Sequence, residues 1–300
     1  MTAIAPGTYL EAEIATQPQD WLAARVTAER HRALLPAAGE RVAVVGCGTS
    51  LYMAQAFAAL REDAGLGVTD AWTPTEHHLE RGYDRVVAIT RSGTTTEVLD
   101  LLDQVRGRMR TTVITSTTGS PALDLADPIL TAEVDESSVV QTRFATTTLA
   151  MLRWHLGEDL TPVAAQAERV LATDESTLGQ AVHADQITFL GRRWTNGIAH
   201  EAALKLRESS QSWTESYPMM EWRHGPVSIA APGRVVWAFG EPVEGLADDV
   251  ARTGAEFVSS DLDAMADLLR VHRLCLVRAR AAGLDADSPR NLTRSIILSA

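Results

Sequence analysis

Short β-branched runs alternate with longer segments of helical spacing in the first half of the chain. RVAVV (41–45) and RVVAI (85–89) are apolar runs, and each ends in a turn rich in glycine or hydroxyl residues. The segments after these turns, LYMAQAFAALRED (51–63) and EVLDLLDQVRGR (97–108), repeat apolar residues at intervals of three and four. The runs predict buried strands, and the spacing predicts amphipathic helices. This alternation predicts an α/β fold, a parallel sheet with helices on both faces.

The second half starts the same pattern again. QITFLG (186–191) and VVWAF (235–239) predict strands, AEFVSS (255–260) a weaker strand, and residues 261–283 a helix. A chain of 300 residues is long enough for two domains. We therefore expect two similar halves, each with its own parallel sheet.

The expected domain boundaries follow from these patterns. Residues 1–30 form an N-terminal helical segment, in which QPQDW (17–21) marks an interruption or a helix start. A first domain is expected at residues 31–165 and a second at 166–300.

Charge and cysteine content narrow the class of protein. The 39 acidic and 27 basic residues give a net charge of −12, which disfavours nucleic acid as a partner. The two cysteines match no disulfide or zinc pattern, so no metal is expected and a reducing compartment fits best. The N-terminus lacks the features of a signal peptide, and no apolar run of about 18 residues occurs. A cytoplasmic protein that does not engage a membrane is expected.

Two turns at the ends of predicted strands are candidate phosphate sites. Residues 46–50 (GCGTS) and 90–96 (TRSGTTT) lie where helix N-termini present free N–H groups to an anion. Leu51 breaks the dinucleotide glycine pattern, and a Walker loop would need a lysine that neither turn has. Hydroxyl groups and backbone N–H groups can hold a phosphate monoester without metal. The alternative is that both are ordinary turns and helix caps.

The only lysine of the chain, Lys205, lies in a predicted helix between two acids. Glu201, Lys205 and Glu208 are spaced so that they share one helical face. The alternative is a solvated stripe with a weak ion pair, for which arginine would serve equally well in this arginine-rich chain. Lysine differs because it can lose its proton when desolvated. We therefore favour a functional face, and His224 follows nearby in a glycine-proline turn.

Four stretches together resemble proteins with SIS (sugar isomerase) domains, including the isomerase half of glucosamine-6-phosphate synthase. They are VVGCGTS with ITRSGTTTEVLDLL, DESSVVQTRFATTTLAML, LGRRWTNGIAHEAALKLRESSQSWTESYPMMEWRHGP, and SPRNLTRS. The resemblance runs from about residue 10 onward. It implies two flavodoxin-like subdomains, and active sites in this family are often completed by a second subunit. A homodimer is therefore expected.

The resemblance also implies roles for particular residues. Glu208 would be the base that moves a proton between C1 and C2 of the open-chain sugar, with His224 assisting ring opening and Glu201 and Lys205 beside them. Candidate residues for binding the sugar phosphate are Gly48, Thr49, Ser50, Thr90, Arg91, Ser92, Thr95 and Arg294. Arg91 stands where the family has glutamine, and Arg294 where the synthase tail has a lysine, so no Schiff base from the tail is expected.

The residues and the family resemblance together predict a phosphosugar isomerase acting on a hexose or aminohexose 6-phosphate by enediol or enediolamine proton transfer, with or without deamination. No cofactor is expected, and a glutaminase domain is not expected in this chain. Two alternatives stay open: a deglycase that releases an amine from a fructosamine 6-phosphate, and a non-catalytic sugar-phosphate sensor.

Overall fold

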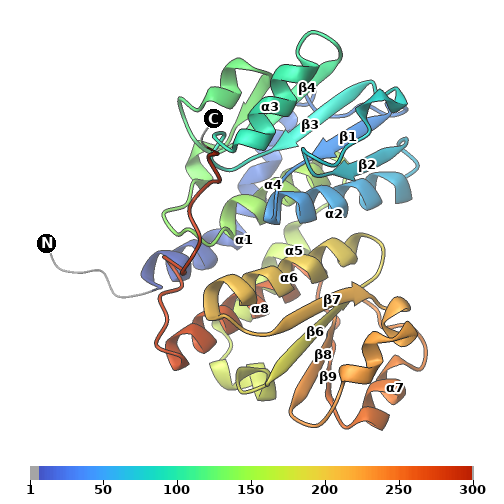
Figure 1. Cartoon of the computed structure of the whole chain (residues 1–300), viewed down its shortest axis with the longest axis vertical. Coiled ribbons are helices and arrows are strands. Elements are labelled where there is room, and N and C mark those ends of the chain that lie inside the picture. Colours follow the sequence, from blue (N-terminus) through green and yellow to red (C-terminus); the bar gives the residue numbers. More distant parts are fainter. Residues whose placement is uncertain (1–6, 299–300) are drawn as a thin grey trace, which may run out of the picture. The chain divides into compact units, whose positions relative to one another are not determined.

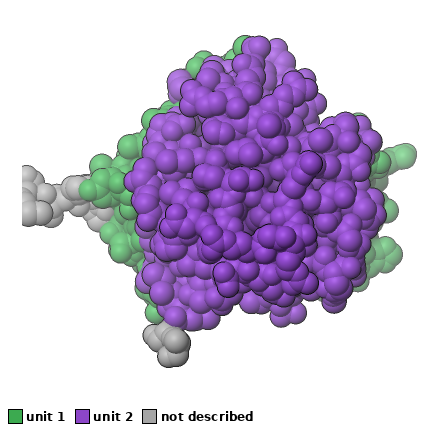
Figure 2. Space-filling view, turned by 90° about the horizontal axis from the view of Figure 1, so that it is seen from above, with its two compact units in different colours: residues 1–18, 137–142, 161–292 green, residues 19–136, 143–160, 293–300 purple. Residues whose placement is uncertain are grey.

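The computed structural model of the chain describes residues 7–298, so the first six residues of the predicted N-terminal segment lie outside it. The chain divides into two compact units, which Figure 2 colours separately. Unit 1 comprises residues 1–18, 137–142 and 161–292, and unit 2 comprises residues 19–136, 143–160 and 293–300. In this division the C-terminal residues belong to the unit that contains the first sheet. A single boundary after residue 165 would have placed them with the second sheet.

Unit 2 is built on a sheet of five parallel strands in the order β2-β1-β3-β4-β5 (Figure 1). Its strands are β1 (Val42–Val45), β2 (Thr69–Trp72), β3 (Arg85–Ile89), β4 (Arg110–Thr115) and β5 (Asp127–Leu130). Its helices are α2 (Thr49–Asp63), α3 (Thr96–Val105) and α4 (Arg143–His155), together with the second part of α1 (Thr8–Arg30). Helices α2 and α4 contact each other on one face of the sheet, and α3 covers the opposite face.

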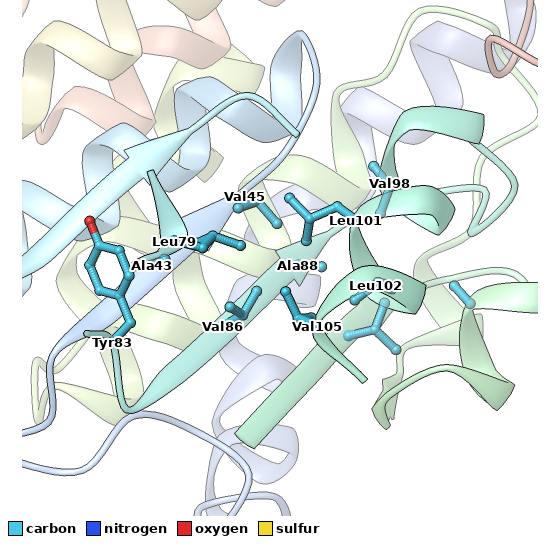
Figure 3. Close-up of a cluster of buried hydrophobic side chains, with 12 residues drawn as sticks. Ala43, Val45, Leu79, Tyr83, Val86, Ala88, Val98, Leu101, Leu102 and Val105 are labelled. Atoms are coloured by element: carbon cyan, nitrogen blue, oxygen red, sulfur yellow. The ribbon is translucent and has the colours of Figure 1, made fainter. Parts of the chain in front are cut away.

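A cluster of buried apolar side chains fixes α3 on the sheet. Val98, Leu102 and Val105 of the helix pack with Ala43 of β1 and Ala88 of β3 (Figure 3). These helical positions are three, four and seven residues apart, so they form one apolar stripe. Because α3 is anchored in this way, its N-terminus is held directly after β3 at the carboxyl edge of the sheet.

Unit 1 repeats this design with four parallel strands in the order β7-β6-β8-β9. Its strands are β6 (Gln186–Gly191), β7 (Thr214–Pro218), β8 (Arg234–Ala238) and β9 (Glu256–Val258). Its helices are α5 (Thr161–Ala172), α6 (Trp194–Ser210), α7 (Leu246–Thr253) and α8 (Ala264–Ala281), with α8 packed against both α5 and α6. Both sheets follow the flavodoxin-like strand order, which confirms the predicted fold class.

The loops after the first strand of each sheet have the same backbone conformation. Gly48 precedes α2 with φ 53° and ψ −124°, and Arg193 precedes α6 with φ 51° and ψ −122°. Gly46 and Gly191 lie just before them, and a Cβ atom at either position would come within 2.7 Å of the backbone of the next helix. The two halves therefore share their strand-to-helix turns as well as their sheets.

The interruption expected at QPQDW is wrong. Helix α1 is continuous from Thr8 to Arg30, with Pro18 inside it. A proline in a helix interior costs about 3 kcal/mol. Gln17 and Trp21, on either side of it, are fully buried in their respective units. Packing of the turns on either side keeps the helix continuous through the proline. Local helix propensity does not include this packing, so the sequence predicted an interruption.

Candidate functional site

The hydroxyl-rich loops of unit 2 lie at the switch point of its sheet. Gly48, Thr49 and Ser50 follow β1, and residues 90–95 follow β3, its neighbour in the sheet. The chain crosses from β2 on one side of β1 to β3 on the other, so the loops after β1 and β3 lead to opposite faces of the sheet. In open α/β sheets, ligands bind at such a switch point. Thr49 and Ser50 begin α2, and Thr95 is the N-cap of α3. The predicted phosphate residues therefore gather where this fold binds ligands.

Hydrogen bonds within the 90–95 loop use the hydroxyl oxygens as acceptors. The N–H of Gly93 donates to Thr90 Oγ1 at 3.3 Å, and the N–H of Thr94 donates to Ser92 Oγ at 3.2 Å. A hydroxyl that accepts in this way still has its own hydrogen to donate. Among residues 7–298, neither of these two hydroxyls donates to a protein acceptor. The loop is thus a hydroxyl turn, as the alternative interpretation expected, and it also keeps donors for an anion.

Gly93 brings this loop close to the neighbouring turn. Its φ is 62°, a conformation that favours glycine. A Cβ atom there would lie 2.2 Å from Ser120 Oγ, which is buried. Glycine is therefore required at this position both for the backbone angle and for the space.

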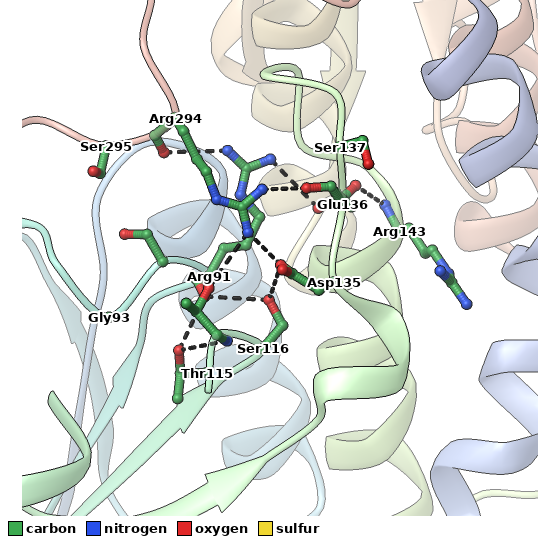
Figure 4. Close-up of polar contacts among 12 residues, drawn as sticks. Arg91, Gly93, Thr115, Ser116, Asp135, Glu136, Ser137, Arg143, Arg294 and Ser295 are labelled. Carbon is green, nitrogen blue, oxygen red and sulfur yellow. Dashed lines mark hydrogen bonds and ion pairs between the residues drawn. The ribbon is translucent and has the colours of Figure 1, made fainter. Parts of the chain in front are cut away.

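The side chain of Arg91 is buried in unit 2 beside the buried carboxylate of Glu136. Its Nη1 atom lies 3.6 Å from Glu136 Oε2, and its Nη2 atom donates to the carbonyl oxygen of Arg294 at 3.1 Å (Figure 4). Its own carbonyl oxygen accepts from Thr115 Oγ1 at 2.9 Å and from Ser116 Oγ at 3.2 Å. The charge of Arg91 is therefore balanced inside unit 2, and a contact of this side chain with substrate stays a prediction.

The C-terminal residues of the described chain lie along the same loop. Arg294 pairs with Asp135 and donates to the carbonyl oxygen of Glu136 (Figure 4). Beyond it, Thr94 Oγ1 donates to Ser295 Oγ at 3.0 Å, and the N–H of Thr96 donates to the carbonyl oxygen of Ile296 at 3.2 Å. Arg294, predicted from a distant part of the sequence, thus joins the loop that carries the other candidate residues.

In unit 1, helix α6 brings the lone lysine between its two acids as predicted. Lys205 Nζ lies 2.5 Å from Glu208 Oε2 and 3.7 Å from Glu201 Oε1. The side chains of Lys205 and Glu201 are each 1% exposed, whereas that of Glu208 is 19% exposed. The stripe is therefore buried and not solvated. Glu208 is the member of the trio that reaches the surface.

Helix α8 adds two buried titratable groups that the sequence analysis did not assign to the site. His272 Nδ1 lies 3.3 Å from Gln17 Nε2, and burial together with the Lys205 ammonium lowers the pKa of His272 to about 3. Burial raises the pKa of the Cys275 thiol to about 12. Both groups are therefore uncharged at neutral pH. The ion-paired groups near them, Glu201, Lys205 and Glu208, lie on α6.

This histidine predicts a pH dependence of stability. The pKa of His272 is lowered from 6.5 to about 3, so the unfolded chain binds the proton more readily than the folded chain. The stabilising contribution is complete above pH 6.5 and is lost as the pH falls towards 3. Between pH 6.5 and about 4.5, the free energy of unfolding should fall by roughly 2 to 3 kcal/mol more than in His272→Gln, which has no such group. Denaturant titrations at several pH values test this, and parallel curves for both proteins would contradict it.

His224 ends a short 3-10 turn, Glu221–His224, on the surface of unit 1. Within residues 7–298 its side chain makes no hydrogen bond or ion pair, and its role in ring opening stays a prediction.

An open pocket lies at the C-terminal end of α6. Its volume is about 380 Å³, and it lies within unit 1. The residues that line it are Arg207, Glu208, Gln211, Ser212, Arg290 and Leu292. The predicted base therefore opens into a cavity, and the two arginines beside it were not predicted. A larger pocket of about 630 Å³, beyond β8 and β9, contains none of the predicted site residues.

The described part of the chain contains neither a candidate metal cluster nor a candidate membrane-spanning helix. No cluster of histidine, cysteine, aspartate or glutamate suited to holding a metal occurs among residues 7–298. None of the helices in that range combines the length and the apolar character needed to cross a membrane.

No protein-family model matches the chain, whereas curated sequences do. Glutamine–fructose-6-phosphate aminotransferase (isomerizing) of Symbiobacterium thermophilum is 27% identical to it over 85% of this chain. The enzyme of the same name from Halobacterium salinarum is 29% identical over 84%. The chain is a homologue of their isomerase (SIS) domain. It spans about half the length of these relatives, 51% of each.

Solved structures share the fold of this SIS homologue. Glucosamine-6-phosphate deaminase from Thermotoga maritima superposes with a TM-score of 0.81, at 22% identity over 96% of this chain and 100% of that one. The C-terminal domain of glucosamine-fructose-6-phosphate aminotransferase from Francisella tularensis gives 0.80, at 20% identity over 94% and 98% of the two chains. Tagatose-6-phosphate ketose/aldose isomerase from Escherichia coli gives 0.76, at 19% identity over 97% and 99%. The SIS fold expected from the four sequence stretches is thereby confirmed.

Proposed function

We propose that the chain is a phosphosugar isomerase that acts on a hexose or aminohexose 6-phosphate, with or without loss of ammonia. The observation that carries the proposal is the α6 face, where a buried lysine holds a partly exposed glutamate at the mouth of a pocket. A carboxylate at a cavity mouth is suited to taking a proton from a carbon acid. The homology to SIS isomerase domains supports the same kind of chemistry.

Glu208 would act as the base in this reaction. Its carboxylate would remove a proton from the carbon next to the carbonyl of the open-chain sugar and return it to the neighbouring carbon. The intermediate is an enediol, or an enediolamine for an aminosugar, and negative charge develops on its oxygen. The Lys205 ammonium, 2.5 Å from Glu208 and 1% exposed, would stabilise that charge.

The remaining roles follow the expected assignments. The hydroxyl loops of unit 2, with their donors at a sheet switch point, would hold the phosphate. Glu201 would balance the charge of Lys205 from the buried side, and His224 would assist ring opening. A homodimer and a cytoplasmic location are what the sequence and the resemblance predict, and they stay predictions.

A panel of substrates tests the proposal. The protein is incubated with hexose and aminohexose 6-phosphates while ketose formation and ammonia release are followed separately. At least one phosphorylated sugar should be converted, and its unphosphorylated counterpart should react at least about 100-fold more slowly, because the phosphate contacts contribute several charge-assisted hydrogen bonds. Tight binding without any conversion across the panel would favour the sugar-phosphate sensor instead.

A further inference from the structure

The turn that carries His224 is fixed to helix α7 by a buried side chain. Trp222 is fully buried, and it packs with Leu246 and Val250 of α7 in one apolar cluster. His224 lies two residues further along the same 3-10 turn and is exposed. One side of the turn is therefore part of the core of unit 1, while the histidine lies at the surface.

Arg223 makes a second link between this turn and α7. Its Nε atom donates to Asp249 Oδ2 at 2.5 Å, and its Nη2 atom donates to the backbone carbonyl oxygen of Glu244 at 2.7 Å. The second contact does not involve the side chain of Glu244. The side chains of Arg223 and Asp249 are 25% and 21% exposed, so solvent screens this charge pair only in part. A guanidinium group held at two points in this way keeps a fixed position.

The direction of the His224 side chain depends on these attachments. Among the described residues, no hydrogen bond holds the imidazole itself. The next residue is Gly225, with φ 135°, and glycine restrains the backbone less than any other residue. The attachments next to His224 are therefore those of Trp222 and Arg223, which precede it.

We propose that Arg223 and Asp249 are positioning residues, which hold His224 where it can assist opening of the sugar ring. This inference rests on the proposed function, because it takes His224 as the group that serves ring opening. Neither residue needs to touch the sugar. A displacement of about 1 Å can cost roughly 100-fold in rate, so loss of the ion pair should be measurable although the turn keeps its tryptophan anchor.

Ring opening gives the proposal a specific signature. The anomeric hydroxyl loses its proton, the bond between C2 and the ring oxygen breaks, and that oxygen gains a proton. An imidazole beside the ring can carry these protons, because it both accepts and donates near neutral pH. Proton transfer between C1 and C2 follows on the open chain and is assigned to Glu208. A displaced His224 should therefore slow ring opening and leave the later step intact.

Two matched sets of substrates separate these steps in the full chain. Fructose 6-phosphate and its epimers at C3 and C4 close their rings through the hydroxyl at C5, whereas their 5-deoxy analogues stay open. All are assayed with and without ammonium. Asp249→Asn and Arg223→Gln should lower kcat/KM at least about tenfold for the ring-forming ketoses, and at most about twofold for the analogues. His224→Asn should show the same selectivity with a larger loss, and combining it with Asp249→Asn should add no further loss.

Arg252→Gln is the matched control. Arg252 belongs to α7 itself, is 71% exposed and pairs with the same Asp249 carboxylate. Its removal leaves the bond from Arg223 in place, so it should change neither rate by more than about twofold. Conversion of the open-chain analogues also shows that each variant is folded.

The outcomes separate the inference from the proposed function. Equal losses on both sets of substrates in Asp249→Asn, or no loss on either, would overturn the inference, because the ion pair would then have no part in ring opening. A selective loss that adds fully to that of His224→Asn would also overturn it, since the pair would then act independently of the histidine. Conversion of both sets without a selective loss in His224→Asn would refute the inference and leave the isomerase intact. No conversion of any compound by the unaltered protein would refute the proposed isomerase, and the inference with it.

Discussion

Glu208→Gln is expected to lower kcat by about 10²- to 10⁴-fold while changing the affinity for the sugar phosphate by no more than a few-fold. Glutamine has the shape of glutamate and keeps an oxygen for the Lys205 ammonium, but it cannot accept the proton from carbon. The phosphate contacts are proposed to lie on the loops of unit 2, so this substitution leaves them intact. Steady-state kinetics and calorimetry with the same sugar phosphate measure both quantities.

The matched control is Glu244→Gln, an exposed glutamate of the same unit that lies outside the pocket. It should keep full turnover, and both variants should show the circular dichroism of the parent protein. Retention of more than a tenth of the turnover by Glu208→Gln would remove this residue as the base. If Glu208→Gln lowers the affinity for the sugar phosphate by as large a factor as it lowers kcat, Glu208 would instead be assigned to ligand binding.

The central strands of both sheets could be predicted from the sequence because they are buried on both faces. β1 (VAVV) is a continuous apolar run, and β3 (RVVAI) and β6 (QITFLG) are mainly apolar. Glycine or hydroxyl turns follow all three, and these signals are local. The edge strands β2 (TDAW) and β5 (DPIL) were missed. Both are four residues long and partly polar, and β5 contains a proline, which an edge strand tolerates and a central strand does not.

The α6 face could be predicted because its members are close in sequence. A helix places Glu201, Lys205 and Glu208 on one side whatever the rest of the fold does. Burial of that side was indicated by the single lysine, since an exposed pair would have served equally well with arginine. The occurrence of a single lysine in the composition thus indicated burial, which helical spacing alone does not reveal.

Other parts of the site depend on contacts between residues far apart in the chain. Arg91 meets Glu136 across 45 residues, and Arg290 reaches the end of α6 from beyond α8. His272 of α8 belongs to no ligand or catalytic spacing in the sequence, so nothing local indicated that it lies near Lys205. Neither periodicity nor motif spacing specifies which distant side chains converge. The sequence therefore indicated the base but not the charge of the pocket that surrounds it.

Lys205→Met is expected to lower the free energy of unfolding by about 3 to 5 kcal/mol. Methionine approximates the volume of lysine but removes the ammonium that lies 3.7 Å from Glu201 Oε1, and the side chain of Glu201 is 1% exposed. A buried carboxylate without its partner carries most of its desolvation cost uncompensated. Chemical denaturation of the full chain, followed by circular dichroism, measures the change.

The chain supplies its own control, because Arg25 and Glu29 form an ion pair with the same i, i+4 spacing but with side chains 61% and 64% exposed. Arg25→Met should cost less than about 1 kcal/mol, since solvent screens such pairs. Adding Glu201→Gln to Lys205→Met should restore at least half of the loss, because the stranded charge is then gone. If Lys205→Met costs no more than Arg25→Met, the α6 face does not hold an ionised pair in a buried environment. The Lys205 ammonium would then have no special strength with which to stabilise an enediolate, and the role proposed for it would fail.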